Sequence, residues 1–189
     1  MKILFLQPAG KGMYYDDMSR SLAKKAQVAV YGPGYPGYDK SATLPSILSN
    51  CPFKPDAVIV GNGWENDDSE HSFDPHPRLD LSILNNFSIP KVMLLNKEYK
   101  KLDQKAKFIH KNSIDVVFTA HHHYYTWERI LKTRVEHLPF AADEEIFRDY
   151  KEDKKYCFGF SGNLFNTGTY KETNIMGPTF NNVRERIAE

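Results

Sequence analysis

Features that would assign the chain to a specialised class are scarce in this sequence. Its two cysteines, Cys51 and Cys157, lie in unrelated segments without CxxC spacing, so we interpret them as the reduced thiols of a cytoplasmic protein. No apolar run approaches the roughly 20 residues that a membrane-spanning helix needs. The formal net charge of +1 supplies no field that would attract nucleic acid or a membrane surface. These absences predict an ordinary globular protein that binds neither nucleic acid nor a membrane.

Standard nucleotide-binding motifs are also missing. The first apolar run is followed by QPAGKGMYY, which is neither the GxGxxG fingerprint nor the GxxxxGK[ST] phosphate loop. We therefore expect no bound cofactor. Gly10, Lys11 and Gly12 in this segment allow a backbone to approach a phosphate or a sugar, and they equally suit a tight turn with a surface lysine.

Short apolar runs alternate with helical patterns along the chain, and 41% of its residues are hydrophobic. The patterns predict strands over residues 3–6, 27–31, 56–60, 91–95, 115–119 and 135–138, and helices over residues 16–26, 44–50, 79–86, 102–111 and 124–132. Strands that are apolar on both faces and separated by helices indicate a parallel sheet covered on both sides. The sequence therefore predicts an α/β fold, a doubly wound parallel sheet, over roughly residues 1–140.

In such a sheet, ligands bind outside the carboxyl ends of the strands, so the loops there hold the candidate site. The loop after the third strand begins GNGWENDD and contains Asn62 and Trp64, which suit hydrogen bonding to sugar hydroxyls and stacking on a sugar ring. The alternative is a solvated loop with one anchoring aromatic residue. Asp67 and Asp68 resemble a metal-binding acidic pair only weakly.

The loop after the fourth strand contains Asn96, Lys97 and Glu98. A carboxylate there can act as a general base, or can hold a hydroxyl while the neighbouring lysine contacts a phosphate. The charges from Lys100 to Lys107 repeat at helical spacing and predict a solvated helix face.

Three consecutive histidines, His121, His122 and His123, follow the fifth strand. Metal-binding pairs on a helix need spacing i, i+4, and consecutive side chains point in different directions, so we predict no metal site. We expect one of these histidines to face the cleft as a hydrogen-bond donor, while another caps or covers the next helix.

Three segments carry a resemblance to a known family. They read NKEYKKLDQKAKFIHKNSIDVVFTAHHHYYTWERI, HLPFAADEEIF and YCFGFSGNLF. Together they resemble glycosyltransferases of the GT-B fold, and the nearest type is the spore-maturation-protein group, close to the "glycosyl transferases group 1" families. The similarity covers about residues 90–165 and is only topological before residue 60.

The resemblance implies two Rossmann-like domains that face each other across a cleft. Residues 1–148 would form the acceptor-side domain, residues 149–155 a linker, and residues 156–189 the first strand and helix of a donor-binding domain. Ser161, Gly162 and Asn163 would form a glycine turn near the donor diphosphate. The acidic donor motif of the family lies farther into the second domain than Glu189, so we expect the donor site to be incomplete here, with possible association through the unfinished domain.

The implied reaction transfers a sugar from a nucleotide sugar to a glycan or another hydroxyl acceptor. Enzymes of this type handle the leaving diphosphate with basic side chains and helix dipoles, without an obligatory metal. An inverting enzyme would need a base, for which Glu98, His121 and His122 are the candidates, whereas a retaining enzyme would not. Two other classes stay open: a non-catalytic flavodoxin-like module that binds a nucleotide or phosphate, and an interaction protein.

Overall fold

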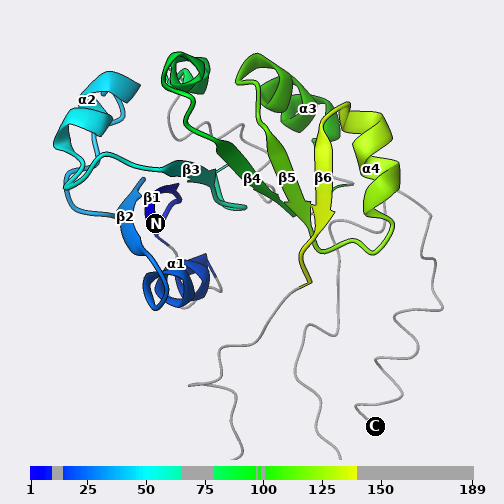
Figure 1. Cartoon of the computed structure of the whole chain (residues 1–189), viewed down its shortest axis with the longest axis horizontal. Helices are drawn as coiled ribbons and strands as arrows, with labels where there is room; N and C mark the ends of the chain where they lie inside the picture. The colour runs from blue at the N-terminus through cyan, green and yellow to red at the C-terminus, as the bar shows by residue number, and fades with distance from the viewer. Residues whose placement is uncertain (10–14, 65–78, 97, 99–100, 140–189) are drawn as a thin grey trace, which may run out of the picture. The chain divides into compact units, whose positions relative to one another are not determined.

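The computed structural model describes residues 1–9, 15–64, 79–96, 98 and 101–139. All of them lie in the first of the two units into which the chain divides, Met1–Phe147 (Figure 1). Its elements in chain order are β1 (Lys2–Leu6), α1 (Tyr15–Ala23), β2 (Gln27–Tyr31), α2 (Leu44–Asn50), β3 (Ala57–Val60), η1 (Leu81–Phe87), β4 (Lys91–Leu95), α3 (Leu102–Lys111), β5 (Val116–Thr119), α4 (Tyr124–Leu131) and β6 (Arg134–His137).

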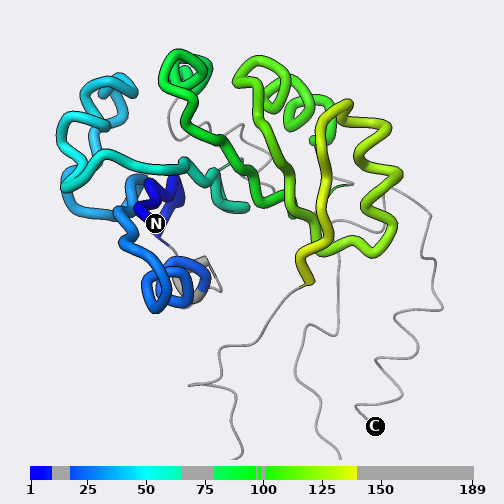
Figure 2. Tube along the Cα trace, in the orientation of Figure 1, coloured from blue at the N-terminus to red at the C-terminus, as the bar shows by residue number. Residues whose placement is uncertain are grey.

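The six described strands form one sheet in the order β2-β1-β3-β4-β5-β6, and every neighbouring pair is parallel. The chain first steps from β1 to β2 in one direction. It then passes back beyond β1 to β3 and continues the other way to β6, a path that Figure 2 traces. The direction of the chain therefore reverses between β1 and β3.

This reversal decides which face of the sheet each helix covers. Crossover connections between parallel strands are right-handed, so a step in the opposite direction places its helix on the opposite face. Figure 1 shows α1 on one side of the sheet and α2, η1, α3 and α4 on the other. The doubly wound α/β fold predicted from the sequence is confirmed to this extent.

Two groups of buried side chains hold these layers together. The larger group lies beneath α2, η1, α3 and α4 and includes Leu6, Val60, Leu84 and Ile109. The smaller group comprises Ile3, Phe5 and Leu94, with partly buried residues of α1 and β2 packed against it. Burial on both faces explains why the strands read as continuous apolar runs.

One predicted helix is of the 3-10 type. A helix was predicted over residues 79–86, and the structure has the 3-10 helix η1 there. Asp80 occupies the N-cap position and its carboxylate accepts the Ser82 N–H at 3.0 Å. The helix ends at Ser88, which adopts a left-handed conformation with φ of 51°. Asn85 and Asn86 favour turns over α-helix, so the short tight helix suits this segment.

The remaining bounds agree closely with the sequence patterns. The predictions for 27–31, 44–50, 91–95 and 102–111 match β2, α2, β4 and α3, and the other elements start or end one to three residues from the expected positions. None of the described helices is long and apolar enough to cross a membrane. The linker and second-domain predictions for residues 149–189 fall outside the described residues and stay predictions.

Candidate functional site

All six strands point the same way, so their carboxyl ends form one edge of the sheet. From β1 to β6 the last strand residues are Leu6, Tyr31, Val60, Leu95, Thr119 and His137. In doubly wound sheets this edge is where ligands bind. Two groups of polar residues lie along the described part of this edge: one follows β4 and β5, and the other lies where the chain reverses, between β1 and β3.

The first group is organised around Thr119, the last residue of β5, which is 1% exposed. Its Oγ1 donates a hydrogen bond to Glu98 Oε1 and accepts one from the His121 backbone N–H at 3.1 Å. Because β4 and β5 are neighbours in the sheet, the loops that follow them meet here. The structure thus joins the two sequence-predicted residues Glu98 and His121 through a threonine that the sequence analysis did not select.

A buried lysine fixes the chain next to this group. Lys105 of α3 is 3% exposed, and its Nζ donates a hydrogen bond to the Asn96 carbonyl oxygen at 2.7 Å. The prediction that all charges between Lys100 and Lys107 lie on a solvated helix face is therefore wrong at Lys105. This residue lies on the same helix stripe as Leu102, Ala106 and Ile109 and anchors the end of β4.

The histidines that follow β5 form a compact group of rings. His121 is half-buried, and its ring stacks on His122 at 5.0 Å between centroids and contacts the edge of Trp127 at 5.8 Å. The His123 backbone N–H donates to His121 Nδ1 at 3.1 Å. In a neutral His121 ring, Nδ1 is therefore the acceptor and Nε2 carries the proton.

The two following histidines have different surroundings. His122 and His123 are exposed, and His123 Nδ1 lies 2.7 Å from the Tyr125 hydroxyl. His123 occupies the N-cap position of α4, and its side chain makes no capping hydrogen bond. Within the described residues, no group of three or more histidine, cysteine, aspartate or glutamate side chains is arranged to hold a metal ion.

The second polar group lies where β1 and β3 end. Gln7 continues β1, its backbone N–H donates to the Tyr31 carbonyl at 3.0 Å, and its side chain packs against Gly61. A Cβ at position 61 would overlap the end of the Gln7 side chain, so a larger residue there would require the Gln7 amide to move. Gln7 is 0% exposed, and neither atom of its amide has a hydrogen-bond partner among the described residues. This buried amide at the reversal point was not selected by the sequence analysis.

The predicted residues of the β3 loop take different positions. Asn62 is half-buried just beyond β3. Trp64 is 1% exposed and belongs to the larger core group, and its backbone N–H donates to the Gly61 carbonyl at 3.0 Å. The sequence left two alternatives for Trp64, stacking on a sugar ring and anchoring the loop. Its burial in the core corresponds to the anchoring alternative. The other predicted site residues, Gly10, Lys11, Gly12, Lys97, Ser161, Gly162 and Asn163, lie outside the described residues.

Comparison with known proteins adds no assignment. No family model, no curated protein and no solved structure matches the chain. The candidate site is therefore interpreted from its own geometry.

Proposed function

We propose that this chain is the acceptor-side part of a GT-B-type glycosyltransferase, which transfers a sugar from a nucleotide sugar to a hydroxyl of an acceptor. The observation that carries the proposal is the Glu98 carboxylate, held by Thr119 at the carboxyl edge of a parallel sheet and next to His121. The fold is of the right class, and the resemblance of residues 90–165 to these enzymes supports the same assignment.

Glu98 has the features of a general base for this reaction. It is half-buried, so it is both oriented and reachable. As the acceptor oxygen forms a bond to the anomeric carbon, its proton passes to Glu98, and the bond between that carbon and the leaving nucleoside diphosphate breaks. A single displacement of this kind inverts the anomeric configuration, so assigning Glu98 as the base makes the enzyme inverting.

The other residues of the group have supporting parts in this proposal. Thr119 holds the carboxylate in place, and Lys105 holds the end of β4 from which the Glu98 loop departs. His121 lies beside them and, with its proton on Nε2, offers a donor to a hydroxyl of the acceptor. The donor diphosphate is assigned by the resemblance alone to the segment that includes Ser161, Gly162 and Asn163.

Release of nucleoside diphosphate tests the proposal. The protein is incubated with a panel of nucleotide sugars and candidate hydroxyl acceptors, and the released diphosphate is measured for wild type and Glu98→Gln. Since a general base contributes about 10²–10⁴-fold, we expect Glu98→Gln to lower kcat by that factor. The matched control is Glu136→Gln, because the Glu136 carboxylate is paired with Arg134 on β6.

Two results would contradict the proposal. One is acceptor-dependent release of diphosphate that is unchanged in Glu98→Gln. The other is the absence of calorimetric binding for every candidate hydroxyl acceptor, because an acceptor-side domain must bind the acceptor even where the donor site is incomplete.

The strand order favours a second candidate function, a flavodoxin-like module that binds a nucleotide or phosphate without turnover. Its first five strands follow the order 2-1-3-4-5, and proteins with this order bind their ligand where the chain reverses, between β1 and β3. Visible absorbance of the purified protein and titration with a free flavin nucleotide distinguish the two. The glycosyltransferase proposal expects neither a yellow protein nor saturable flavin binding.

A further inference from the structure

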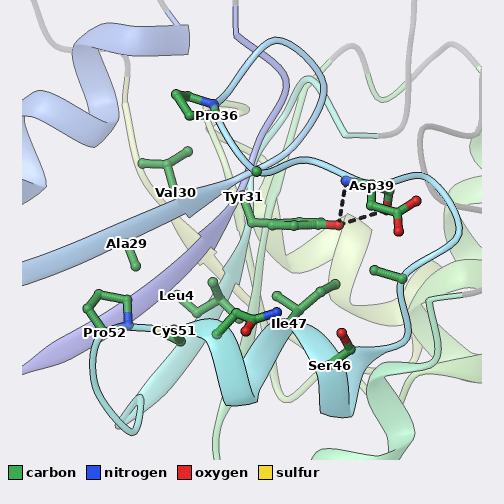
Figure 3. Close-up of a pocket in the computed structure, with 13 residues that line it drawn as sticks. Leu4, Ala29, Val30, Tyr31, Pro36, Asp39, Ser46, Ile47, Cys51 and Pro52 are labelled. Atoms are coloured by element: carbon green, nitrogen blue, oxygen red, sulfur yellow. Dashed lines mark hydrogen bonds between the residues drawn. The ribbon is translucent and has the colours of Figure 1, made fainter.

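A pocket of about 320 Å³ lies between β2 and α2, apart from the Glu98 group (Figure 3). Its volume is near the lower end of the range of about 300–1,000 Å³ that is typical of small-molecule sites. A hollow of this size suits one ring. Its thirteen lining residues include Leu4, Tyr31, Asp39, Ser46, Ile47 and Asn50.

The ring of Tyr31 forms a fixed wall of this pocket. Its hydroxyl donates to the Asp39 carbonyl at 2.8 Å and accepts the Asp39 N–H at 3.1 Å. Figure 3 shows the ring above α2, with Leu4 and Ile47 among the side chains between them. An aromatic face backed by aliphatic side chains is a surface on which the C–H groups of a sugar ring pack.

Polar groups on α2 complete the pocket. Ser46 and Asn50 are four residues apart, so they lie on one side of the helix, together with Ile47. Both are exposed, and within the described part of the chain neither side chain is engaged in a hydrogen bond. They are available to bind hydroxyl groups.

The charge of the lining limits the chemical class of the ligand. None of the thirteen lining residues is lysine, arginine or histidine, and the single charged residue is Asp39. Phosphates and carboxylates are bound in proteins by basic side chains or by helix N-termini. The lining therefore disfavours a nucleotide and favours a neutral ligand with hydroxyl groups.

We propose that this pocket binds one neutral saccharide ring, stacked on Tyr31 and hydrogen-bonded to Ser46 and Asn50. β2 and β4 are separated by three strand spacings, which is about 14 Å, so the pocket is too far from the Glu98 loop to hold the ring that reacts. The ring is a remote unit of the acceptor, which makes the acceptor a glycan of several sugars. The binding claim stands alone, and the assignment to the acceptor rests on the proposed function.

Cys51 reports on occupancy of this pocket, and the Ser46 variant separates that signal from occupancy of the apolar groove that Cys51 also lines. It is a free, half-buried cysteine that lines the pocket, and Cys157→Ser makes it the single thiol of the chain. The rate of Cys51 alkylation by iodoacetamide is measured against increasing concentrations of glucose, galactose, N-acetylglucosamine and their disaccharides, with uridine and adenosine in parallel. We expect at least one saccharide to slow alkylation saturably.

Two serines of α2 give a matched pair of variants. Ser46→Ala removes a hydroxyl from the pocket. Ser49→Ala removes a neighbouring hydroxyl that donates to the Ser46 carbonyl at 2.9 Å and does not line this pocket; Ser49 and Cys51 line a separate apolar groove with Phe53 and Phe87. Losing one hydrogen bond weakens binding about fivefold, so Ser46→Ala should raise the half-protecting concentration by that factor, and Ser49→Ala should leave it unchanged.

Three results would overturn the inference: no saccharide protects Cys51, protection is equal in wild type and Ser46→Ala, or a nucleoside protects and the sugars do not. Each can occur while diphosphate release still depends on Glu98, so failure of this site is distinguishable from failure of the proposed function. Conversely, protection by a sugar without Glu98-dependent release would support the pocket and contradict the enzyme.

Discussion

Replacing Gln7 by methionine should make the protein more stable. Methionine is close to glutamine in length and carries no group that needs a hydrogen bond. Gln7 is 0% exposed, and both of its amide atoms lack a partner among the described residues. The native protein therefore carries a desolvated amide that water would satisfy in the unfolded chain.

The size of the effect follows from that burial. A buried polar group left without a hydrogen bond costs about 1–3 kcal/mol in measured variants. We expect Gln7→Met to recover about this much, less whatever is lost where the methionine side chain fits poorly against Gly61. A domain of this size gains about 2–4 °C in Tm for each kcal/mol. The expected shift is thus on the order of 2–10 °C.

Urea and thermal unfolding, followed by circular dichroism, measure the change. Gln104→Met is the control, because Gln104 is exposed on α3 and its replacement should stay within about 0.5 kcal/mol of wild type. A clear loss of stability in Gln7→Met would refute the expectation that relieving the unpaired amide outweighs any loss from side-chain fit.

The position of Gln7 suggests a use for its amide. It lies where the chain reverses between β1 and β3, the point at which doubly wound sheets bind ligands. An amide offers a donor and an acceptor side by side, which suits a ligand hydroxyl. We therefore expect Gln7→Met to be more stable and yet less active in diphosphate release, the usual cost of optimising a functional position.

Two further predictions concern stability away from the candidate site. Asn112 is 1% exposed, its Oδ1 accepts the Leu81 N–H and its Nδ2 donates to the Phe108 carbonyl, both at 2.9 Å. Because Asn112→Ala removes both hydrogen bonds, it should lower the free energy of unfolding in urea by about 2–4 kcal/mol. Hydrogen bonds from the Ser82 hydroxyl and backbone lower the pKa of the Asp80 carboxyl, so Asp80 stabilises the folded state above its ordinary pKa and loses that contribution as the pH falls through the lowered value. Asp80→Ala should cost about 1 kcal/mol at pH 7, and the difference from wild type should shrink below about pH 4; a constant difference would contradict the N-cap assignment.

Most of the fold could be predicted from the sequence because its signals are local. Apolar runs such as 91–95 and 3–6 are buried on both faces of the sheet, and the breakers between the runs mark the turns. The 3-10 type of η1 was not predicted, and one hydrogen bond at its start comes from far along the chain: Asn112, 31 positions from Leu81, accepts that residue's N–H. A local sequence pattern does not reveal a hydrogen bond between residues so far apart in the chain.

The candidate site was only partly predictable, for a related reason. The rule that ligands bind at the carboxyl ends of strands selected Glu98 and His121. Lys105 could have been found, because it lies on the apolar stripe of α3. Thr119 and Gln7 carry no such signal, since a threonine that ends a strand and a glutamine that follows one are common. Their roles depend on which strands become neighbours in the sheet, and local sequence patterns do not reveal the strand order.

The direction of the hydrogen bonds around Thr119 gives the strongest reason to place chemistry at Glu98. A hydroxyl group has one proton to donate, and the Thr119 hydroxyl already accepts the His121 backbone N–H. Its own proton is directed to Glu98 Oε1, so the order runs from His121 N–H through Thr119 to the carboxylate. An ionised carboxylate can only accept hydrogen bonds, so Thr119 is the donor in this pair, and the bond orients Glu98 from a buried strand end. Under the proposed function, the carboxylate would accept the proton of the acceptor hydroxyl in the same way, from an orientation that is set before substrate binds.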